Sequence, residues 1–367
     1  MRRFSIYFAG SIAGGSNFKK QQQDIVLALE ELGHFVVSRQ HAFTLKSEKK
    51  TIKPKDIFER DIWWLLKKSQ IMVAEVSAPS FGLGFEAGVA GMAQIPVIAL
   101  VAEEQKGKIS AFVEGVSHMG HWQVVYYPKN NPKKIKGLLK KALSKVKIPH
   151  FKGKYIAFEG MNQCGKGIQI EMLAKRLDKE GIDYEIVKEP GKTWLGWEIR
   201  KLLQAQEEDI PTIRAEVALL MAQRAHLVEK LIIPSLKKGK LVISDRSMGT
   251  SLSFQGLGRK EGIIGIAGLN NYAVKQVIPH LTLFLDISLE EMKRRKGKEE
   301  DEPDGPDRFD YKEKLDFTKR CFRGYKKVIQ LDRKSPPKRW KVIDGHGTRE
   351  EVHNKVWESI KKVLNEK

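Results

Sequence analysis

A carboxylate follows a run of small residues in the string SAPSFGLGFE. Ser80, Gly82 and Gly84 stand just before Glu86, and the apolar run IMVAEVS precedes them. Small residues allow a phosphate to approach the backbone N–H groups at the start of a helix, and Glu86 would then lie one turn into that helix, pointing at the bound group. A lone glutamate in the first turn of a helix is usually a surface residue that stabilises the helix dipole, so other residues must support a site here.

Two other stretches carry such residues. The segment Tyr7–Ser11 ends the first apolar run and is followed by Gly14, and ligands of parallel α/β sheets bind at the carboxyl ends of strands. Asp61 lies beside Trp63 and Trp64 in a helical pattern. Each stretch alone is weak evidence, and it is their order and spacing together that indicate a function.

Together, the strings YFAGSIAGG, ERDIWWL and VAEVSAPSFGLGFE resemble the 2′-deoxynucleoside 5′-phosphate N-hydrolases, which are relatives of the nucleoside 2-deoxyribosyltransferases. The resemblance covers nearly all of residues 3–127. It implies a retaining mechanism in which Glu86 attacks the anomeric carbon of the sugar, the base leaves, and water cleaves the deoxyribosyl-enzyme. Asp61 would orient or protonate the base side, and Tyr7 would position Glu86.

The same resemblance implies a binding site for the substrate's sugar and 5′-phosphate. Its residues would be Gly10, Ser11, Gly14, Ser80, Gly82, Gly84 and Ser110. In that family the second serine, here Ser110, comes from a neighbouring subunit, which implies a homodimer. The family's phosphate-binding arginine is Ala13 in this chain, and Lys19 or Lys20 could substitute for it.

A second chemical motif lies in the string FEGMNQCGKGIQ. It follows an apolar run and matches the phosphate-binding pattern G-x-x-x-x-G-K-[ST] at Gly160, Gly165 and Lys166, but Gly167 stands where a hydroxyl would hold magnesium. In such a loop the backbone N–H groups of residues 160–166 cradle the donor phosphates, and Lys166 reaches their outer oxygens.

Further strings in order (KEPGKTWLGWEIRKLL, EVALLMAQRAH, VISDRSMGTSLSFQGLGR, LTLFLDIS and DRFD) complete a resemblance to thymidylate kinase along most of residues 154–330. The resemblance implies that ATP and Mg²⁺ serve this half, with Asp245 near the metal, whereas the first half needs no cofactor. Arg246 would grip the acceptor monophosphate, because a guanidinium binds phosphate bidentately. The acceptor nucleotide would contact Asn162, Arg224 and Gln255. ATP would contact Gly160, Gly165, Lys166, Gly167 and the basic closing lid with Arg294, Arg295 and Arg308.

Four departures from that family fall where chemistry and base recognition occur. Gly167 lacks the hydroxyl, Asn162 replaces an aspartate, Leu220 replaces a phenylalanine that stacks on thymine, and Ser247 replaces an aromatic residue. Two interpretations stay open for this half: an active nucleoside monophosphate kinase, or a catalytically impaired nucleotide-binding regulatory module. The alternative to an enzyme is a binding protein, which would sense nucleotides at both sites and control a partner.

Both halves alternate strand and helix patterns, which predicts parallel sheets covered on both faces. The expected fold is α/β with two doubly wound parallel-sheet domains, the first Rossmann-like and nucleoside deoxyribosyltransferase-like, the second a P-loop, thymidylate-kinase fold. We place the domains at residues 1–147 and 154–367, with a linker at 148–153 that contains Pro149. Ser288 and Glu291 are spaced as a capping box at a helix start, and residues 296–308 have the composition of a mobile loop.

Composition bounds the class of protein. The chain has 367 residues, enough for about two domains, and a net charge of +21 that is spread over both halves. This excess fits a solvated lysine-rich surface, and the sharper alternatives are attraction of phosphorylated ligands or of nucleic acid. Nucleic-acid binding is the less favoured, because no recognised motif or stacking platform accompanies the charge. Two cysteines cannot build a disulfide framework, and the apolar runs are too short to span a bilayer, so we expect a cytoplasmic protein.

Overall fold

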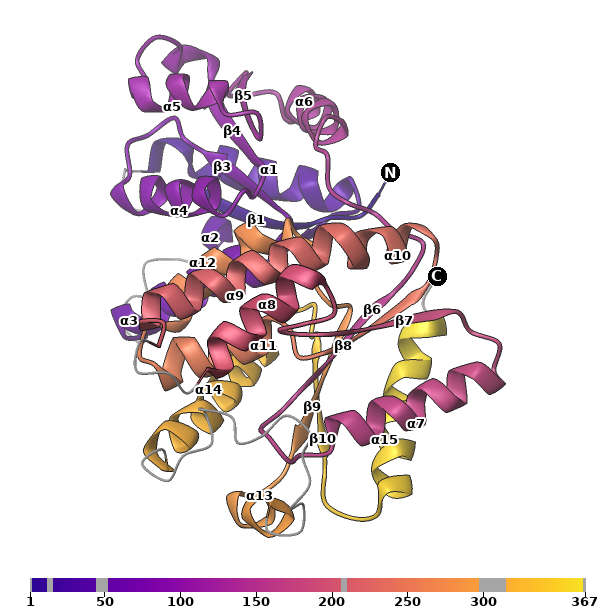
Figure 1. Cartoon of the computed structure of the whole chain (residues 1–367). Coiled ribbons are helices and arrows are strands. Elements are labelled where there is room, and N and C mark those ends of the chain that lie inside the picture. The colour runs from indigo at the N-terminus through magenta and orange to yellow at the C-terminus, as the bar shows by residue number, and fades with distance from the viewer. Residues whose placement is uncertain (1, 12–15, 44–51, 206–209, 297–314, 366–367) are drawn as a thin grey trace. The chain divides into compact units, whose positions relative to one another are not determined.

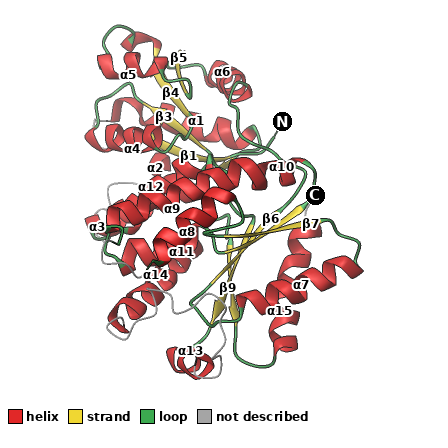
Figure 2. Cartoon of the chain, viewed as in Figure 1, coloured by secondary structure: helices red, strands yellow, loops and turns green. Residues whose placement is uncertain are grey.

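The computed structural model describes residues 2–11, 16–43, 52–205, 210–296 and 315–365, and the chain divides into two compact units, residues 1–148 and 149–367 (Figure 1). Each unit is built around a five-stranded sheet in which every described pairing is parallel, with helices on its faces (Figure 2). The prediction of two doubly wound α/β domains is therefore confirmed.

The sheet of the first unit has the strand order β2-β1-β3-β4-β5. Its strands are β1 (Ser5–Gly10), β2 (Phe35–Val36), β3 (Ile71–Glu75), β4 (Val97–Ala102) and β5 (Trp122–Tyr127). The order reverses between β1 and β3, whose ends meet at the pair Gly10 and Glu75. Ligands of such sheets bind at the carboxyl edge beside this reversal, so the edge between β1 and β3 is the expected place for a site.

Helices cover both faces of this sheet. On one face, α1 (Lys19–Glu31) and α6 (Pro132–Ser144) pack against the strands through one apolar cluster that includes Ile25, Leu29 and Leu139. The other face receives α4 (Phe81–Met92) and the π-helical turn Trp64–Lys68, which continues α3 (Pro54–Trp63). The shorter helices are α2 (Gln40–Phe43) and α5 (Ala111–Gly115).

The sheet of the second unit has the order β10-β9-β6-β8-β7. Its strands are β6 (Tyr155–Glu159), β7 (Tyr184–Lys188), β8 (Leu241–Asp245), β9 (Leu281–Asp286) and β10 (Trp340–Asp344). One face carries α7 (Lys166–Lys179) and α15 (Arg349–Asn365), which lie side by side in Figure 1. The central strand β6 leads directly into the loop that precedes α7, so this loop lies at the carboxyl edge of the sheet.

The opposite face of the second sheet carries the remaining long helices. These are α9 (Ile213–Leu227), α12 (Ile263–Val274) and α14 (Leu315–Arg333), with the π-helical stretch Leu252–Gly258. Shorter or peripheral helices are α8 (Trp194–Gln204), α10 (Ile233–Lys237), α11 (Met248–Ser251) and α13 (Leu289–Lys296). Both cysteines are buried free thiols. Among the described residues, no helix combines the length and apolar character that a membrane crossing requires.

Half of the predicted capping box at α13 forms. Ser288 Oγ accepts the backbone N–H of Glu291 at 3.1 Å, which is the helix-capping bond that the spacing predicts. The Glu291 carboxylate does not return to the cap, because it accepts hydrogen bonds from Arg294 and Arg295 at 2.7 Å each. Residues 297–308, most of the segment expected to form a mobile loop, lie outside the described residues.

Candidate functional site

Glu86 meets Tyr7 at the carboxyl edge of the first sheet. Tyr7, on β1, is fully buried and donates its hydroxyl to Oε1 of Glu86, on α4, at 3.0 Å. Burial raises the pKa of Glu86, and the nearby charge of Asp61 raises it further, while His41 and the Tyr7 hydrogen bond oppose the shift. The result is a partly desolvated carboxylate with one oxygen anchored, an arrangement suited to a nucleophile.

A second acid–base pair lies beside Glu86. Nε2 of His41, on α2, is 3.4 Å from Oδ2 of Asp61, on α3, and its Nδ1 is 3.2 Å from the Phe8 carbonyl oxygen. The His41 ring also stands edge-on to the Tyr7 ring, with centroids 5.6 Å apart. Burial alone lowers the pKa of His41, but the hydrogen bond and charge of Asp61 outweigh it and raise the pKa. In turn, burial alone raises the pKa of Asp61, but His41 and Arg60 hold it below its ordinary value.

Sequence reasoning missed His41. It lies in the string SRQHAF, where no periodicity or spacing links it to Asp61 twenty residues later. Only the path of the chain, which carries α2 and α3 to the same edge of the sheet, brings the imidazole to the carboxylate.

Small residues border this carboxylate group on α4. Ser80 caps the helix, since its hydroxyl accepts the Leu83 backbone N–H at 3.4 Å. Gly82 and Gly84 are exposed, and a side chain at either would meet no other atom within 4 Å. Ser80 accepts the N–H groups of Leu83 and Gly84 through its hydroxyl and its carbonyl oxygen, so the first N–H groups of α4 and the positive end of its dipole are what remain for a phosphate near Glu86.

Lys19 is the better placed of the two lysines considered as substitutes for the missing arginine. Its ammonium donates to the His41 carbonyl oxygen at 3.4 Å, so it stands next to the site. Lys20 instead forms an exposed ion pair with Asp24 at 3.2 Å. A cation can thus reach the site from α1, although Ala13 itself lies outside the described residues.

The other residues assigned to this site differ in burial. Gly10 packs tightly, because a side chain there would lie 2.8 Å from Gln22, and Ser11 is buried beside it. Ser110 caps α5 by accepting the Phe112 N–H at 3.3 Å and is exposed. No described bond joins Ser110 to the carboxylate group within one chain. Gly14 lies outside the described residues.

In the second unit, the loop before α7 has the geometry of a phosphate-binding loop. Gly160 and Gly165 have φ of +149° and +88°, values that disfavour other residues. A side chain at Gly160 would lie 2.6 Å from the Cys164 sulfur and 2.8 Å from the Leu285 carbonyl oxygen, so only glycine fits. Lys166 is buried and donates to the carbonyl oxygens of Met161 at 3.0 Å and Gly160 at 3.3 Å. Its ammonium is therefore held inside the loop, where phosphate oxygens could replace these acceptors.

Asp245 ends β8, and Arg246 follows it next to this loop. Arg246 donates to the Gly160 carbonyl oxygen at 3.2 Å, to Thr250 Oγ1 at 3.3 Å and to Asn162 Oδ1. The Asp245 oxygen Oδ1 is buried and has no hydrogen-bond partner among the described residues. Since Mg²⁺ prefers carboxylate oxygens, this orphaned atom fits a metal ligand. Gly167 offers no hydroxyl, so phosphate and water oxygens would have to complete the coordination.

Two of the residues assigned to the acceptor nucleotide, Arg224 and Gln255, already donate hydrogen bonds to other groups of the protein. Arg224 is buried and donates to Glu189 at 2.6 Å, to Ser251 at 2.9 Å and to the Ser247 carbonyl oxygen at 3.0 Å. It also donates to Asn270 at 2.5 Å, so four of its five N–H groups have protein acceptors. Gln255 is buried and donates to Glu216 at 2.7 Å. Leu220, on α9, is half-buried.

On the ATP side, Arg295 spans two loops. It donates to the Gly345 carbonyl oxygen at 2.8 Å and approaches the Gln163 carbonyl oxygen at 3.5 Å. Arg294 is engaged by Glu291. Arg308 lies outside the described residues.

A buried carboxylate that sequence analysis did not select joins the two loops. Glu159, at the end of β6, accepts the backbone N–H groups of Ser247 and Thr250 at 3.0 Å each. It also accepts the hydroxyls of Thr250 at 2.6 Å and Tyr325 at 2.9 Å. Glu159 therefore fixes the segment after Asp245-Arg246 relative to the phosphate-binding loop.

The geometry defines two α/β units: a Rossmann-like unit with a carboxylate site at the strand reversal, and a unit with a phosphate-binding loop. Comparison with known proteins makes this specific. The family model "Thymidylate kinase" matches residues 158–356, and the model "Nucleoside 2-deoxyribosyltransferase" matches residues 6–136. The chain thus belongs to the thymidylate kinase family and carries an N-terminal nucleoside 2-deoxyribosyltransferase domain, which associates it with deoxynucleotide metabolism.

Curated thymidylate kinases support this assignment. That of Thermoanaerobacter sp. (strain X514) is 36% identical over 213 residues, which are 58% of this chain and 100% of the relative. That of Kosmotoga olearia is 37% identical over 202 residues, which are 55% of this chain and 92% of the relative. That of Prochlorococcus marinus (strain NATL1A) is 35% identical over 222 residues, which are 59% of this chain and 100% of the relative.

Proposed function

We propose that the first unit hydrolyses the N-glycosidic bond of 2′-deoxynucleoside 5′-monophosphates, releasing the free base and deoxyribose 5-phosphate. The observation that carries this proposal is the Glu86 carboxylate, hydrogen-bonded by Tyr7 at 3.0 Å and flanked by the His41–Asp61 pair. A nucleophilic carboxylate next to a proton-carrying pair is the equipment of a retaining glycosidase.

Each residue of the site has a role in this reaction. The free oxygen of Glu86 attacks C1′, and the C1′–N bond breaks as the base takes a proton from the Asp61–His41 pair. Water then gives a proton back to that pair and attacks C1′, which releases Glu86. The cycle consumes one water and leaves the enzyme unchanged.

The phosphate explains why monophosphates are the proposed substrates. Ser80 and the exposed Gly82 lie at the positive end of α4, where Gly82 and Gly84 leave open space, and Lys19 adds a cation near His41. An anionic group bound there would hold the deoxyribose over Glu86.

The test is release of free base from a panel of deoxynucleoside 5′-monophosphates and from the matching nucleosides, followed by chromatography. Base should appear from at least one monophosphate, faster than from its nucleoside, and Glu86→Gln should abolish it. Adding a second free base distinguishes hydrolysis from transfer, because transfer yields a new nucleotide. No base from any substrate, with wild type equal to Glu86→Gln, would remove the hydrolase proposal.

We further propose that the first unit acts as a homodimer in which Ser110 of the second copy completes the phosphate site. Support comes from the apolar residues exposed on α4 and α5: Phe81 and Phe112 are 94% and 82% exposed, and Met92 is 79% exposed. Exposed apolar side chains in one region commonly mark an interface. Light scattering of the full chain should report a dimer or larger species, and Phe112→Glu should reduce both the mass and the rate of base release.

For the second unit we propose binding, and slow phosphorylation, of thymidylate or a related monophosphate with ATP. Lys166 and the loop N–H groups would hold the donor phosphates, and Arg246 would hold the acceptor phosphate. Asp245 would hold Mg²⁺, which would supply charge neutralisation for the phosphates. The alternative, a nucleotide-binding regulatory module, is favoured by Gly167, by Leu220 in place of a stacking ring and by the internal bonds of Arg224.

The two versions of this proposal differ in turnover. ADP release with ATP, Mg²⁺ and dTMP measures phosphorylation, and calorimetry measures binding under the same conditions. Measurable turnover that Lys166→Met removes supports a kinase, whereas tight binding with no ADP release supports a regulatory module.

A further inference from the structure

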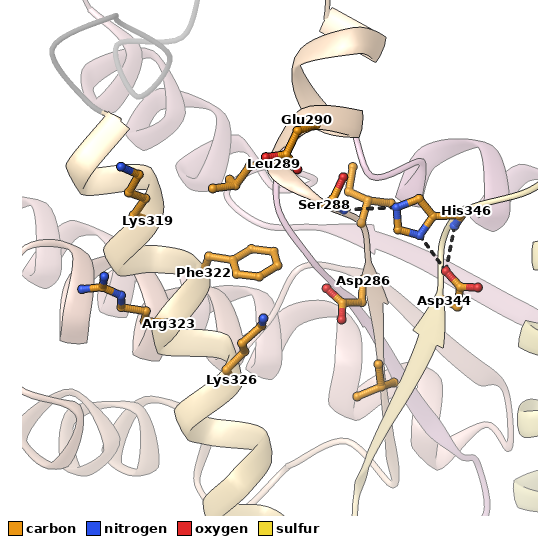
Figure 3. Close-up of a pocket in the computed structure, with 12 residues that line it drawn as sticks. Asp286, Ser288, Leu289, Glu290, Lys319, Phe322, Arg323, Lys326, Asp344 and His346 are labelled. Atoms are coloured by element: carbon orange, nitrogen blue, oxygen red, sulfur yellow. Dashed lines mark hydrogen bonds and ion pairs between the residues drawn. The ribbon is translucent and has the colours of Figure 1, made fainter.

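A cavity of about 710 Å³ opens at the carboxyl ends of β9 and β10 (Figure 3). Its volume is within the range of small-molecule sites. One wall is the end of β9 with the start of α13, and the other is α14. Figure 3 shows Phe322 and Lys326 pointing from α14 toward Asp286, whereas Lys319 and Arg323 stand farther out on the same helix.

The α14 wall is cationic and has one aromatic ring. Lys319, Phe322, Arg323 and Lys326 follow helical spacing and so share one side of α14. The three cations are exposed, and none has a hydrogen bond or ion pair to a described residue. Lys326 Nζ lies 4.5 Å from the centroid of the Phe322 ring. This side of the helix therefore places three cations next to a half-buried ring, and the carboxylates of Asp286 and Glu290 line the same cavity.

The opposite wall carries the carboxylates of Asp286 and Glu290, and Asp286 is the one toward which Phe322 and Lys326 point. The Asp286 carboxylate, half-buried at the end of β9, forms no hydrogen bond or ion pair with any residue in the described part of the chain. Asp344 also lines the cavity, but His346 at 2.7 Å and Lys355 at 3.3 Å already bind it. Asp286 is thus available to accept hydrogen bonds from a ligand.

The cavity is separate from the phosphate-binding loop. No residue of segment 160–166, nor Asp245, Arg246 or Arg295, lines it. The loop nevertheless packs against the end of β9, because a side chain at Gly160 would lie 2.8 Å from the carbonyl oxygen of Leu285, the residue before Asp286. A ligand on Asp286 would therefore be next to the loop without occupying it.

We propose that this cavity is a second nucleotide site, which binds a nucleoside polyphosphate whose base carries an amino group. The base would lie against Phe322 with its amino group donating to Asp286, and the phosphates would extend outward to Lys319 and Arg323. These two cations are one helical turn apart, about 6 Å, a spacing that suits neighbouring phosphate groups. The inference does not depend on either activity proposed above.

The base preference follows from the chemistry of Asp286. An ionised carboxylate accepts hydrogen bonds and donates none. The 4-amino group of cytosine and the 6-amino group of adenine are donors, whereas the oxygens at these positions in uracil and hypoxanthine are acceptors and would face the carboxylate unfavourably. The pairs dCTP with dUTP and ATP with ITP differ at the exocyclic atom that Asp286 would contact and in the hydrogen on the adjacent ring nitrogen, which only the oxo bases carry.

The test measures binding of these four nucleotides to the full chain by calorimetry. The phosphate-binding loop is first saturated with an analogue in which adenosine and thymidine are joined by five phosphates. dCTP or ATP should still bind at one equivalent per chain, at least about 10-fold more tightly than its oxo partner. Asp286→Asn should remove that preference, and Lys319→Ala with Arg323→Ala should weaken binding by about 10-fold or more.

Arg333→Ala is the matched control, because Arg333 is an exposed arginine on the same helix outside the cavity. It should leave affinity unchanged. The proposal is overturned by any of three results: no binding once the analogue is present, equal affinity in the Lys319→Ala/Arg323→Ala variant, or equal affinity of the amino and oxo partners. Inorganic tripolyphosphate that binds as tightly as dCTP would also overturn it, because the base would then contribute nothing.

Discussion

At the scale of single residues, the first unit separates two carboxylates by environment. Glu86 has a pKa raised by burial and by Asp61, whereas His41 and Arg60 keep the pKa of Asp61 low despite burial. Pairs of titratable groups whose pKa values are pushed apart are typical of acid–base assignments in active sites. The same arrangement disfavours an ionised Glu86 in the folded state, so it costs stability as the pH rises through the raised pKa.

The first prediction concerns the pH dependence of base release. Glu86 attacks as the carboxylate, so kcat/KM should fall as the pH drops through its raised pKa. Tyr7→Phe removes a hydrogen bond that favours the charged form. The pKa of Glu86 should therefore rise further, and the acidic limb of the pH–rate profile should move to higher pH, with a rate loss of about 10-fold near neutrality.

Tyr127→Phe is the control for this profile. Tyr127 is also a buried tyrosine that donates to a buried glutamate, Glu75, at 2.9 Å, but it has no bond to Glu86. It should lower stability without moving the acidic limb. An unshifted limb in Tyr7→Phe would contradict the role given to Glu86.

The second prediction concerns Gly167. A side chain at this position meets no other atom within 4 Å, so Gly167→Thr adds a hydroxyl without a clash. If its absence limits phosphorylation, ADP release with ATP, Mg²⁺ and dTMP should rise by about 10-fold or more, because one direct Mg²⁺ ligand is restored. Gly167→Ala fills the same space without the hydroxyl and should not change the rate. A wild-type rate already equal to that of Gly167→Thr would show that the loop is not impaired.

At the scale of elements, hydrogen bonds and close packing connect the strand ends of the second unit to the loops that follow them. Glu159 on β6 accepts four hydrogen bonds from the segment after β8 and from α14, and Gly160 lies against the end of β9. Three neighbouring strands therefore meet at the phosphate-binding loop.

The third prediction tests Glu159 as this connection. Glu159→Leu leaves the N–H groups of Ser247 and Thr250 buried without an acceptor, which should lower the free energy of unfolding by about 2–4 kcal/mol. Glu159→Gln keeps one oxygen for these two N–H groups, and the hydroxyls of Thr250 and Tyr325 can accept from its amide, so the loss should stay below about 1 kcal/mol. Urea unfolding followed by circular dichroism measures both. An equal loss of unfolding free energy in the two variants would show that the hydrogen bonds of Glu159 do not contribute to stability.

At the scale of the whole molecule, the two units have separate hydrophobic cores. Each described hydrophobic cluster draws its residues from one unit only, the first from residues 4–148 and the others from residues beyond 149. A cluster of this kind is enough for a domain to fold by itself.

The fourth prediction follows from this division. Thermal unfolding of the full chain should show two transitions. A ligand stabilises the state that binds it, so a deoxynucleoside monophosphate with the inactive Glu86→Gln variant should raise the midpoint of one transition, and the adenosine–thymidine analogue should raise the other. Lys166→Met should abolish only the second shift. A single transition that either ligand moves would mean that the units unfold together.

Much of the fold and part of the site could be read from local patterns. Apolar runs such as residues 71–77 and 281–288 predicted strands, because a strand buried on both faces is rich in apolar residues along its length. The loop 160–166 was found because its glycines are required by backbone conformation, which is a property of adjacent residues. Strands β5 and β10 were not selected, since their half-buried residues do not form an apolar run.

The amino-acid sequence alone selected the residues proposed to carry the chemistry, Glu86, Asp61, Tyr7 and Lys166, each from a motif of nearby positions. Only the tertiary structure decided that His41 joins Asp61, that Lys19 rather than Lys20 stands at the site, and that Glu159 connects the loops of the second unit. The physical reason is distance along the chain. Propensity and spacing act over one or two helical turns. The carboxyl edge of a parallel sheet instead brings together residues far apart in the chain, such as Glu159 and Tyr325, which are 166 positions apart. No local sequence pattern predicts such a contact.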